Sequence, residues 1–416
     1  MTKKLLAIAV AGLSSAALAQ SSLTISGVMR VGVESVSAGG ATVNNQDMTS
    51  RTRATDNGSH IRFAGEEALG NGLTAWFQVE SAIGSTDNQG TACAPAPGAA
   101  NCTTIGTRNT AVGVKGAWGN LFMGKWDVHY DSGNNVDTTN GNDAFSSRAQ
   151  ILNITNGNGA AATATGKDAA NIFGGREKNT IGYDSPDFNG FAAKVFYSTQ
   201  SENVSPNLAA KDSMWAVTPG YNKGPITAFY SYMKLSNAGA TAVPAAGASG
   251  NNSTGQRVGA AYTFPMGLKI GLVWDRNKIE VADGTASLGA LGITVANGGN
   301  GGNVLAHSRR ERTAWGLPIQ YVTGAHRFNV AYAKADDIST DAGTVGDSGA
   351  RLYVFGYEYS MSRRTSVAVL YSAITNGSNA AYDFRESSAN IAGTSGAGLS
   401  AGADPRTVQL AVRHAF

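Results

Sequence analysis

The sequence predicts an all-β protein, a sixteen-stranded antiparallel transmembrane β-barrel with long outer loops and short periplasmic turns. Three observations predict this fold: an N-terminal export signal, strands that carry one apolar face, and an alternation of short and long connections along the chain. We therefore expect one barrel domain over residues 20–416, without an internal linker.

Residues 1–19 have the features of a secretory signal peptide. Lys3 and Lys4 precede a short stretch of apolar and small residues, which ends in the cleavage pattern Ala17-Leu18-Ala19. A transmembrane anchor is the alternative, but the stretch is short and is interrupted by glycine and serine. We expect cleavage before Gln20 and export of the remaining chain.

The composition is that of a glycine-rich β protein with nearly balanced charge. The chain has 53 glycines and only 10 prolines, a mix that suits many strands with glycine-rich connections. It carries 32 Lys and Arg against 29 Asp and Glu, so no nucleic-acid partner is expected. After the leader, no apolar run reaches the roughly 18 residues of a membrane helix. Composition alone leaves a soluble β protein and a membrane barrel equally open.

Period-two alternation identifies the strands. Leu73, Ala75, Phe77 and Val79 alternate with more polar positions, and the same pattern occurs at residues 23–34, 268–275, 328–333 and 407–413. Such a segment is a strand with one apolar and one polar face. Aromatic side chains share the apolar side, which is typical of the belt at a membrane interface: Trp274, Phe328, Tyr332, Tyr353, Phe355, Tyr357, Tyr359 and Tyr371.

Short and long connections alternate along the mature chain, which a soluble sandwich, the alternative, does not require. The short ones lie at residues 70–72, 119–120, 185–190, 222–224, 265–267, 323–325 and 361–364. The long polar ones lie around residues 37–58, 84–107, 127–177, 201–211, 237–254, 281–309, 337–349 and 376–404. This pattern implies about sixteen strands with both termini on the periplasmic side. A barrel of that size leaves an aqueous channel, and lipid requires it to be closed.

Several motifs resemble trimeric Gram-negative general diffusion porins, especially those of the beta-proteobacterial type. The most specific are the hairpin at residues 59–77, which reads SHIRFAGEEALGNGLTAWF, and the C-terminal strand with its ending VRHAF. Residues 108–125 and 179–191 are also similar. The resemblance covers the chain from the leader to Phe416. It implies a cofactor-free homotrimer in the cell outer membrane, in contact with lipid and lipopolysaccharide, that lets small hydrophilic solutes and ions diffuse passively.

The longest loop, residues 127–177, corresponds in the resembled family to the loop that folds into the barrel and forms the constriction. Acidic groups on that loop then face basic groups on the wall and produce a transverse field. The loop offers Asp127, Asp131, Asp137 and Asp143 for this role. For each of them, an ordinary solvated loop carboxylate is the alternative.

On the wall, Arg30 and Arg62 fall on the inward side of their strands by the alternation. An inward position is favoured because a charged side chain that faces lipid at mid-depth costs about 2–4 kcal/mol. His60 and Ala64 stand where the resembled family commonly carries arginine, so its ion preference is not carried over.

Lys125 is the third candidate for the pore wall. It occupies the position of a Gly-Arg pair in the resembled family, where this chain reads Gly124-Lys125. The parity of Leu121 and Met123 would place Lys125 outside, so an inward Lys125 requires a kink at Gly124. The expectation of an inward side chain therefore comes from the resemblance and not from periodicity.

Cys93 and Cys102 lie in the same long polar loop of an exported protein. An oxidising compartment favours a local disulfide between them, which would stabilise the fold by about 2–3 kcal/mol. Two free thiols are the alternative. A metal site is not expected, because no histidine lies nearby.

Phe416 ends the chain on the apolar parity of the last strand. It is expected to serve as an interfacial aromatic, and a terminal Phe also resembles the signal that the barrel assembly machinery recognises.

The sequence favours a channel over an enzyme. No nucleophile elbow, metal-binding histidine pair or phosphate loop surrounds its five histidines. Two functions stay open: a passive general pore, and a binding protein on the same barrel. The latter would be a substrate-selective channel or a surface adhesin that uses the loops at 84–107 and 281–309.

Overall fold

The chain folds almost entirely into antiparallel strands in the computed structural model, which describes residues 22–83, 105–132, 136, 176–199, 213–238, 251–280, 309–384 and 399–416. These ranges contain one four-residue helix, α2 (His129–Ser132). None of their helical residues form a segment long and apolar enough to cross a membrane. The strands are β1 (Ser22–Gly39), β2 (Met48–Asp56), β3 (His60–Gly70), β4 (Leu73–Ala82), β5 (Thr110–Gly116), β6 (Gly119–Asp127), β7 (Arg176–Asp184), β8 (Phe191–Ser198), β9 (Ser213–Lys223), β10 (Ile226–Ala238), β11 (Asn251–Thr263), β12 (Leu268–Glu280), β13 (Arg309–Thr323), β14 (His326–Ala335), β15 (Ile338–Thr340), β16 (Gly343–Val345), β17 (Ala350–Ser360), β18 (Thr365–Asn376) and β19 (Asp404–Ala415).

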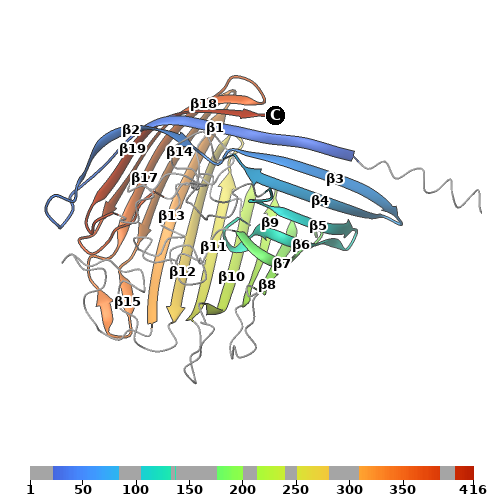
Figure 1. The fold of residues 1–416 in the computed structure, drawn as a ribbon, viewed down its shortest axis with the longest axis horizontal. Coiled ribbons are helices and arrows are strands. Elements are labelled where there is room, and N and C mark those ends of the chain that lie inside the picture. The colour runs from blue at the N-terminus through green and yellow to red at the C-terminus, as the bar shows by residue number, and fades with distance from the viewer. Residues whose placement is uncertain are drawn as a thin grey trace, which may run out of the picture.

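The strands form one ring, which the first and last of them close (Figure 1). β1 pairs with β19 from Val28↔Ala415 to Gly39↔Asp404. β2 and β3 share one position in the ring, because β1 pairs with β3 through its first half and with β2 through its second. β15 and β16 form a hairpin between β14 and β17, which pair directly with each other. The fold is therefore the predicted closed barrel of sixteen strands.

The two faces of each strand differ in the way that a membrane barrel requires. On β12, Leu272 and Trp274 are 55% and 37% exposed, whereas Val273 and Asp275 between and beside them are 1% and 0% exposed. The outer surface is thus the apolar one, and it suits contact with hydrocarbon. The aromatic side chains predicted for this surface include six that are exposed there: Trp274, Phe328, Phe355, Tyr357, Tyr359 and Tyr371.

Tight turns join the strands at one end of the barrel, as predicted. Asn71 and Gly72 connect β3 to β4 with φ values of 52° and 76°. Two consecutive positive φ values match the right-handed twist of a hairpin, and asparagine and glycine tolerate them best.

The predicted connections were wrong in four details. The turn between β5 and β6 lies at residues 117–118, two residues before the predicted position, and β11 begins at Asn251 inside the predicted loop 237–254. β2 lies within the predicted loop 37–58, and the β15–β16 hairpin within 337–349. These additions lie at the loop ends of the strands, where both faces of a hairpin can be polar, so no apolar alternation marks them.

Apolar side chains also pack inside the barrel, in two clusters. The smaller joins α2 and its flanks to the inner faces of β8, β9, β10 and β12: Val128, Tyr130, Phe196, Met214, Ala216, Met233, Leu235 and Ile279. The larger extends along β10–β14, β17–β19 and β1 and joins these strands to Val136 and to the connection between β18 and β19. It includes Leu352, Val354, Ala368, Leu370, Ala380, Ala381, Tyr382, Phe384 and Leu399. Two connections therefore lie in the lumen rather than outside it.

Candidate functional site in the barrel lumen

The chain turns into the lumen at the end of β6, and we call residues 127–132 and 136 the inward segment. Val128 and Tyr130 are fully buried and pack with Phe196 of β8 and Met214 of β9. The hydroxyl of Thr218, on the inner face of β9, donates a hydrogen bond of 3.2 Å to the carbonyl oxygen of His129. These contacts fix the first part of the inward segment to the wall.

Val136 shows how far the inward segment reaches. It is fully buried, and a Cβ atom placed on Gly271 of β12 would lie 2.9 Å from Val136 Cγ1 and 3.1 Å from Cγ of Pro318. Gly271 has the same parity as the inward-facing Val273. The inward segment therefore touches the inner face at β8 and β9 and again at β12, six strands along the ring from β6.

His129 is the titratable group at the start of α2. Its ring lies edge-on to Phe122 and Phe196, and its Nε2 is 3.5 Å from Oδ1 of Asp184. Burial and, more weakly, the charge of Lys194 lower the pKa of His129 to about 4, although Asp184 acts in the opposite direction. The imidazole is therefore neutral at neutral pH.

A buried polar cluster lies where the inward segment meets β11, β12 and β13; we call it the Asp275 cluster. Its members are Tyr130, Arg257, Asp275, Asn277 and Arg312, all of them at most 2% exposed. The carboxylate of Asp275 accepts hydrogen bonds from the Tyr130 hydroxyl, from Arg257 Nε at 3.0 Å, from Asn277 Nδ2 at 3.1 Å and from Arg312 Nη2 at 3.5 Å. Burial, followed by the charge of Asp275, raises the pKa of Tyr130 well above 10.

Ion pairs line another part of the wall, from β1 to β7. Glu34 pairs with Arg53 at 2.7 Å, and Glu80 pairs with Arg108. Where the inward segment begins, Asp127 pairs with Arg176 of β7 at 2.9 Å. Asn109 joins these two groups: its amide nitrogen donates to Asp127 at 2.7 Å, and its oxygen accepts from Arg176 at 3.0 Å.

Arg30 and Arg62, the arginines that periodicity placed on the inner side, lie among these pairs. Arg62 is opposite Glu80 in the β3–β4 register, so the two share a face of the sheet, and its Nε donates to Ser26 Oγ at 3.1 Å. Arg30 is 9% exposed, and its backbone amide donates to Ser59 Oγ at 2.9 Å.

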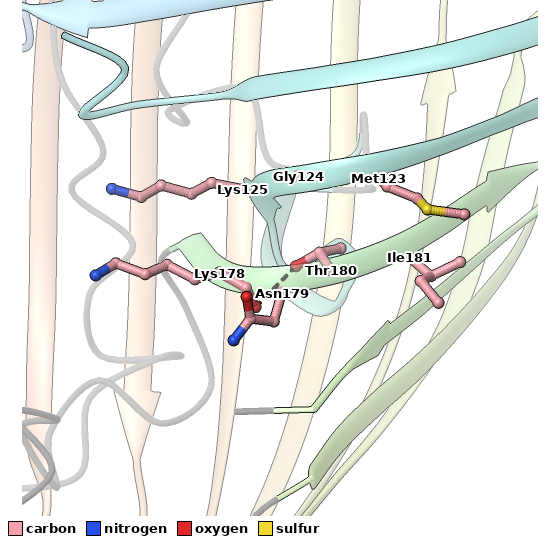
Figure 2. Close-up of a pocket in the computed structure, with 7 residues that line it drawn as sticks. All are labelled: Met123, Gly124, Lys125, Lys178, Asn179, Thr180 and Ile181. Atoms are coloured by element: carbon pink, nitrogen blue, oxygen red, sulfur yellow. Dashed lines mark hydrogen bonds between the residues drawn. The ribbon is translucent and has the colours of Figure 1, made fainter. Parts of the chain in front are cut away.

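Lys125 lies beside an irregularity of the kind that an inward position requires. Gly124 has a φ of 153°, and the β6–β7 register shifts between Gly124 and Trp126. Figure 2 shows Lys125 and Lys178 extending in the same direction, away from Met123 and Ile181, at a groove of about 430 Å³. The Lys125 ammonium donates to the carbonyl oxygen of Thr107 at 2.5 Å.

The remaining predicted site residues have different outcomes. Asp131 belongs to α2, but its side chain is outside the described part of the chain, as are Asp137, Asp143, Cys93, Cys102 and the signal peptide. Phe416 closes the ring: its amide donates to the carbonyl of Gly27 at 3.1 Å, and its carbonyl accepts from the Gly27 amide at 3.0 Å.

Several residues of the site were not singled out from the sequence. Arg108, Arg176 and Glu80 line the wall near Arg62, and Arg257 and Arg312 complete the Asp275 cluster. Apart from Arg108, which lies two residues before β5, their sequence signal is a charge on the polar side of a strand. That signal predicts a side chain that faces the lumen, but it does not predict which partner the side chain will pair with.

The comparisons with known proteins agree with this architecture. A family model described as "Gram-negative porin" matches residues 6–379. An outer membrane porin protein of Bordetella pertussis is 26% identical over 397 residues, which cover 88% of this chain and 92% of that one. The major outer membrane protein P.IB of Neisseria sicca is 30% identical, but the match spans only 50% of this chain and 49% of that protein.

Solved structures share the fold at lower identity. The anion-selective porin from Comamonas acidovorans superposes with a TM-score of 0.65 at 20% identity, covering 95% of this chain and all of that one. In-vitro folded OmpT of Vibrio cholerae, in its trimer form, gives a TM-score of 0.59 at 14% identity and covers 95% of this chain and 99% of its own.

Proposed function

This chain belongs to the Gram-negative porin family and forms a diffusion channel in the cell outer membrane, and on that premise we propose that its inward segment is the constriction of the channel. One observation carries the proposal: the inward segment leaves β6 and reaches the inner face of β12 at Val136 and Gly271. A segment that extends this far inside the ring reduces the open cross-section.

The charged groups beside the inward segment favour the passage of anions. Arg108 and Arg176 are balanced by Glu80 and Asp127. Arg62 and Lys125, in contrast, form no ion pair within the described part of the chain: they donate to the uncharged oxygens of Ser26 and Thr107. Glu80, opposite Arg62, is paired with Arg108, and Lys125 interacts more strongly with the like charge of Arg176 than with the carboxylate of Glu177. Fixed positive charge along a narrow, water-filled path attracts anions and repels cations.

Reversal potentials in planar bilayers test this charge assignment. We expect the wild-type channel to prefer chloride over potassium, and the double variant Arg62→Gln, Lys125→Gln to shift the reversal potential towards cations. The matched control is Lys115→Gln, Lys223→Gln, which removes two positive charges near the short turns, one from an exposed ion pair with Glu66. An unchanged potential in the first variant would show that Arg62 and Lys125 are not at the constriction.

Passive diffusion sets this proposal apart from the binding alternatives. Large ohmic conductance steps that millimolar sugars do not alter support a general pore. Block by one solute class would instead indicate a substrate-selective channel, and folded oligomer without conductance would rule out the pore. Since porins are channels, we further infer that this chain performs no catalysis.

The family indicates the oligomeric state and the lipid partners, and Phe416 indicates contact with the barrel assembly machinery. We propose a homotrimer, which the trimer form of OmpT supports, embedded among outer-membrane lipid and lipopolysaccharide. We also propose Phe416 as the residue that the barrel assembly machinery reads, because its ring is exposed at the end of the closing strand. Light scattering of the detergent-purified protein tests the trimer, and deletion of Phe416 with measurement of assembled barrel tests the signal.

A further inference from the structure

The Asp275 cluster contacts a second lumenal connection besides the inward segment. Residues 377–384 and 399–403, which we call the last connection, join β18 to β19. Asn376 holds both parts of it, since its amide nitrogen donates to the carbonyls of Tyr382 at 3.0 Å and Ala403 at 2.6 Å, and its oxygen accepts from the Tyr382 amide at 2.9 Å. The last connection is thus a built element of the lumen.

Apolar packing holds the last connection against the wall. Tyr382 and Phe384 are buried in the same cluster as Leu352 and Val354 of β17 and Leu370 of β18. These strand residues have the inward parity, because residues of the opposite parity, Phe355 and Tyr357 on β17 and Val369 and Tyr371 on β18, are exposed on the outer surface. The last connection therefore occupies lumen volume on the side of β17 and β18.

One residue of the Asp275 cluster reaches each connection. The guanidinium carbon of Arg257 lies 4.8 Å from the ring centroid of Tyr130, in the inward segment. That of Arg312 lies 6.0 Å from the ring centroid of Tyr382, in the last connection. Both arginines bond to Asp275, which also accepts the Tyr130 hydroxyl. A fully buried carboxylate with these partners holds their positions together, because each bond is strong in a low-dielectric site.

We propose that Asp275 and Arg312 couple the two lumenal connections, so that the inward segment and the last connection keep or lose their positions together. The proposal rests on the constriction role of the inward segment. Asp275 is a positioning residue here: it acts through Tyr130 and Arg312 and not by touching the solute. Its loss would weaken the hold on both connections at once, whereas loss of Tyr130 or Tyr382 removes one contact each.

A double-variant cycle tests the coupling. The measured quantity is the rate of closing events in single-channel recordings at fixed voltage, for Tyr130→Phe, Tyr382→Leu and the double variant. Tyr130→Phe removes one hydroxyl and is expected to fold, and Asp275→Asn serves as a further variant that keeps the side-chain volume. The matched control is Arg276→Gln, whose exposed ion pair with Glu311 lies on the other parity of β12.

Coupling predicts that each single variant closes about threefold or more faster than wild type, and that the double variant and Asp275→Asn close no faster than the faster single variant. Arg276→Gln should stay within about twofold of wild type. If the two single effects multiply in the double variant, the connections are held independently and the coupling is overturned. If neither single variant changes closing or conductance, the constriction role fails together with the coupling.

Discussion

Gly27 lies at the point where the first and last strands of the barrel meet. A Cβ atom there would lie 2.5 Å from Cζ of Phe416 and 2.6 Å from the carbonyl oxygen of His60. The Phe416 ring can rotate away, but the His60 oxygen belongs to the backbone of β3, and it can move only if the β1–β3 pairing moves too. Glycine is therefore required by close approach, without any special backbone angle.

We expect Gly27→Ala to destabilise the closed barrel by about 1–3 kcal/mol through this overlap. The measurement is the temperature at which the folded band converts to the unfolded band in seminative gel electrophoresis. Gly346→Ala is the matched control, because a Cβ atom at Gly346 meets no atom within 4 Å. Equal transition temperatures for the two variants would contradict the close-approach argument.

Arg108 is the second residue whose substitution should lower the stability of the barrel by a predictable amount. Glu80 is 7% exposed, and Arg108 is the cation that pairs with it. Arg108→Gln should lower the free energy of unfolding by about 1–3 kcal/mol, since a buried carboxylate loses its charged partner. Urea unfolding in lipid vesicles measures the change. Lys115→Gln, which breaks the exposed pair with Glu66, should change it by less than about 1 kcal/mol.

At the scale of the element, α2 should respond to pH through His129. The pKa of His129 is about 4 in the docked helix and 6.5 for the ordinary side chain in water. Between these values the released helix binds the extra proton. Docking is therefore fully favoured above pH 6.5 and weakens as the pH falls towards 4, by at most about 1.4 kcal/mol per pH unit.

This shift predicts more frequent channel closure, or a noisier open channel, at pH 5 than at pH 7.5. Single-channel recordings at the two pH values measure it. In His129→Gln the same comparison should show a much smaller difference, because the variant has no imidazole to protonate. An equally steep pH dependence in both proteins would assign the effect to another group.

The strands themselves were largely predictable from the sequence. Alternation such as Leu272 and Trp274 outside with Val273 and Asp275 inside is imposed by lipid on one face and the lumen on the other. Turn residues such as Asn71 and Gly72 marked the ends. β2 was missed because most of its side chains on both faces are exposed, so its sequence shows no apolar alternation. Its pairing with β1 shows that it is a strand.

The candidate site was predictable only in part. Parity placed Arg62 on the inner face, opposite Glu80 in the structure. It could not show that Asp275 would meet Tyr130, which is 145 residues away in the chain. Such contacts depend on where a loop enters the lumen. A loop has no regular alternation of residues, so its path cannot be predicted from the sequence pattern.

For the whole molecule, the outer surface is apolar and the interior buries charged groups, which is the reverse of a soluble protein, although two apolar clusters also pack in the lumen. Leu272, Phe355 and Leu410 are exposed on the outer surface, while Arg257, Asp275 and Arg312 are buried within the ring. Lipid is therefore part of the solvent that stabilises this fold. These charged residues lie where the two lumenal connections contact the wall, and they hold those connections in position inside the channel.

The hydrogen bonds between Gly27 and Phe416 also imply that closure of the ring is a late step of assembly. β19 follows every other described strand in the sequence, and among the described strands it alone covers the edge of β1 along residues 28–39 on that side. Until β19 has been synthesised and exported, that edge stays open to any other extended chain. The ring forms in one late step that joins the two most distant strands of the sequence, so intermediates before that step need protection from aggregation.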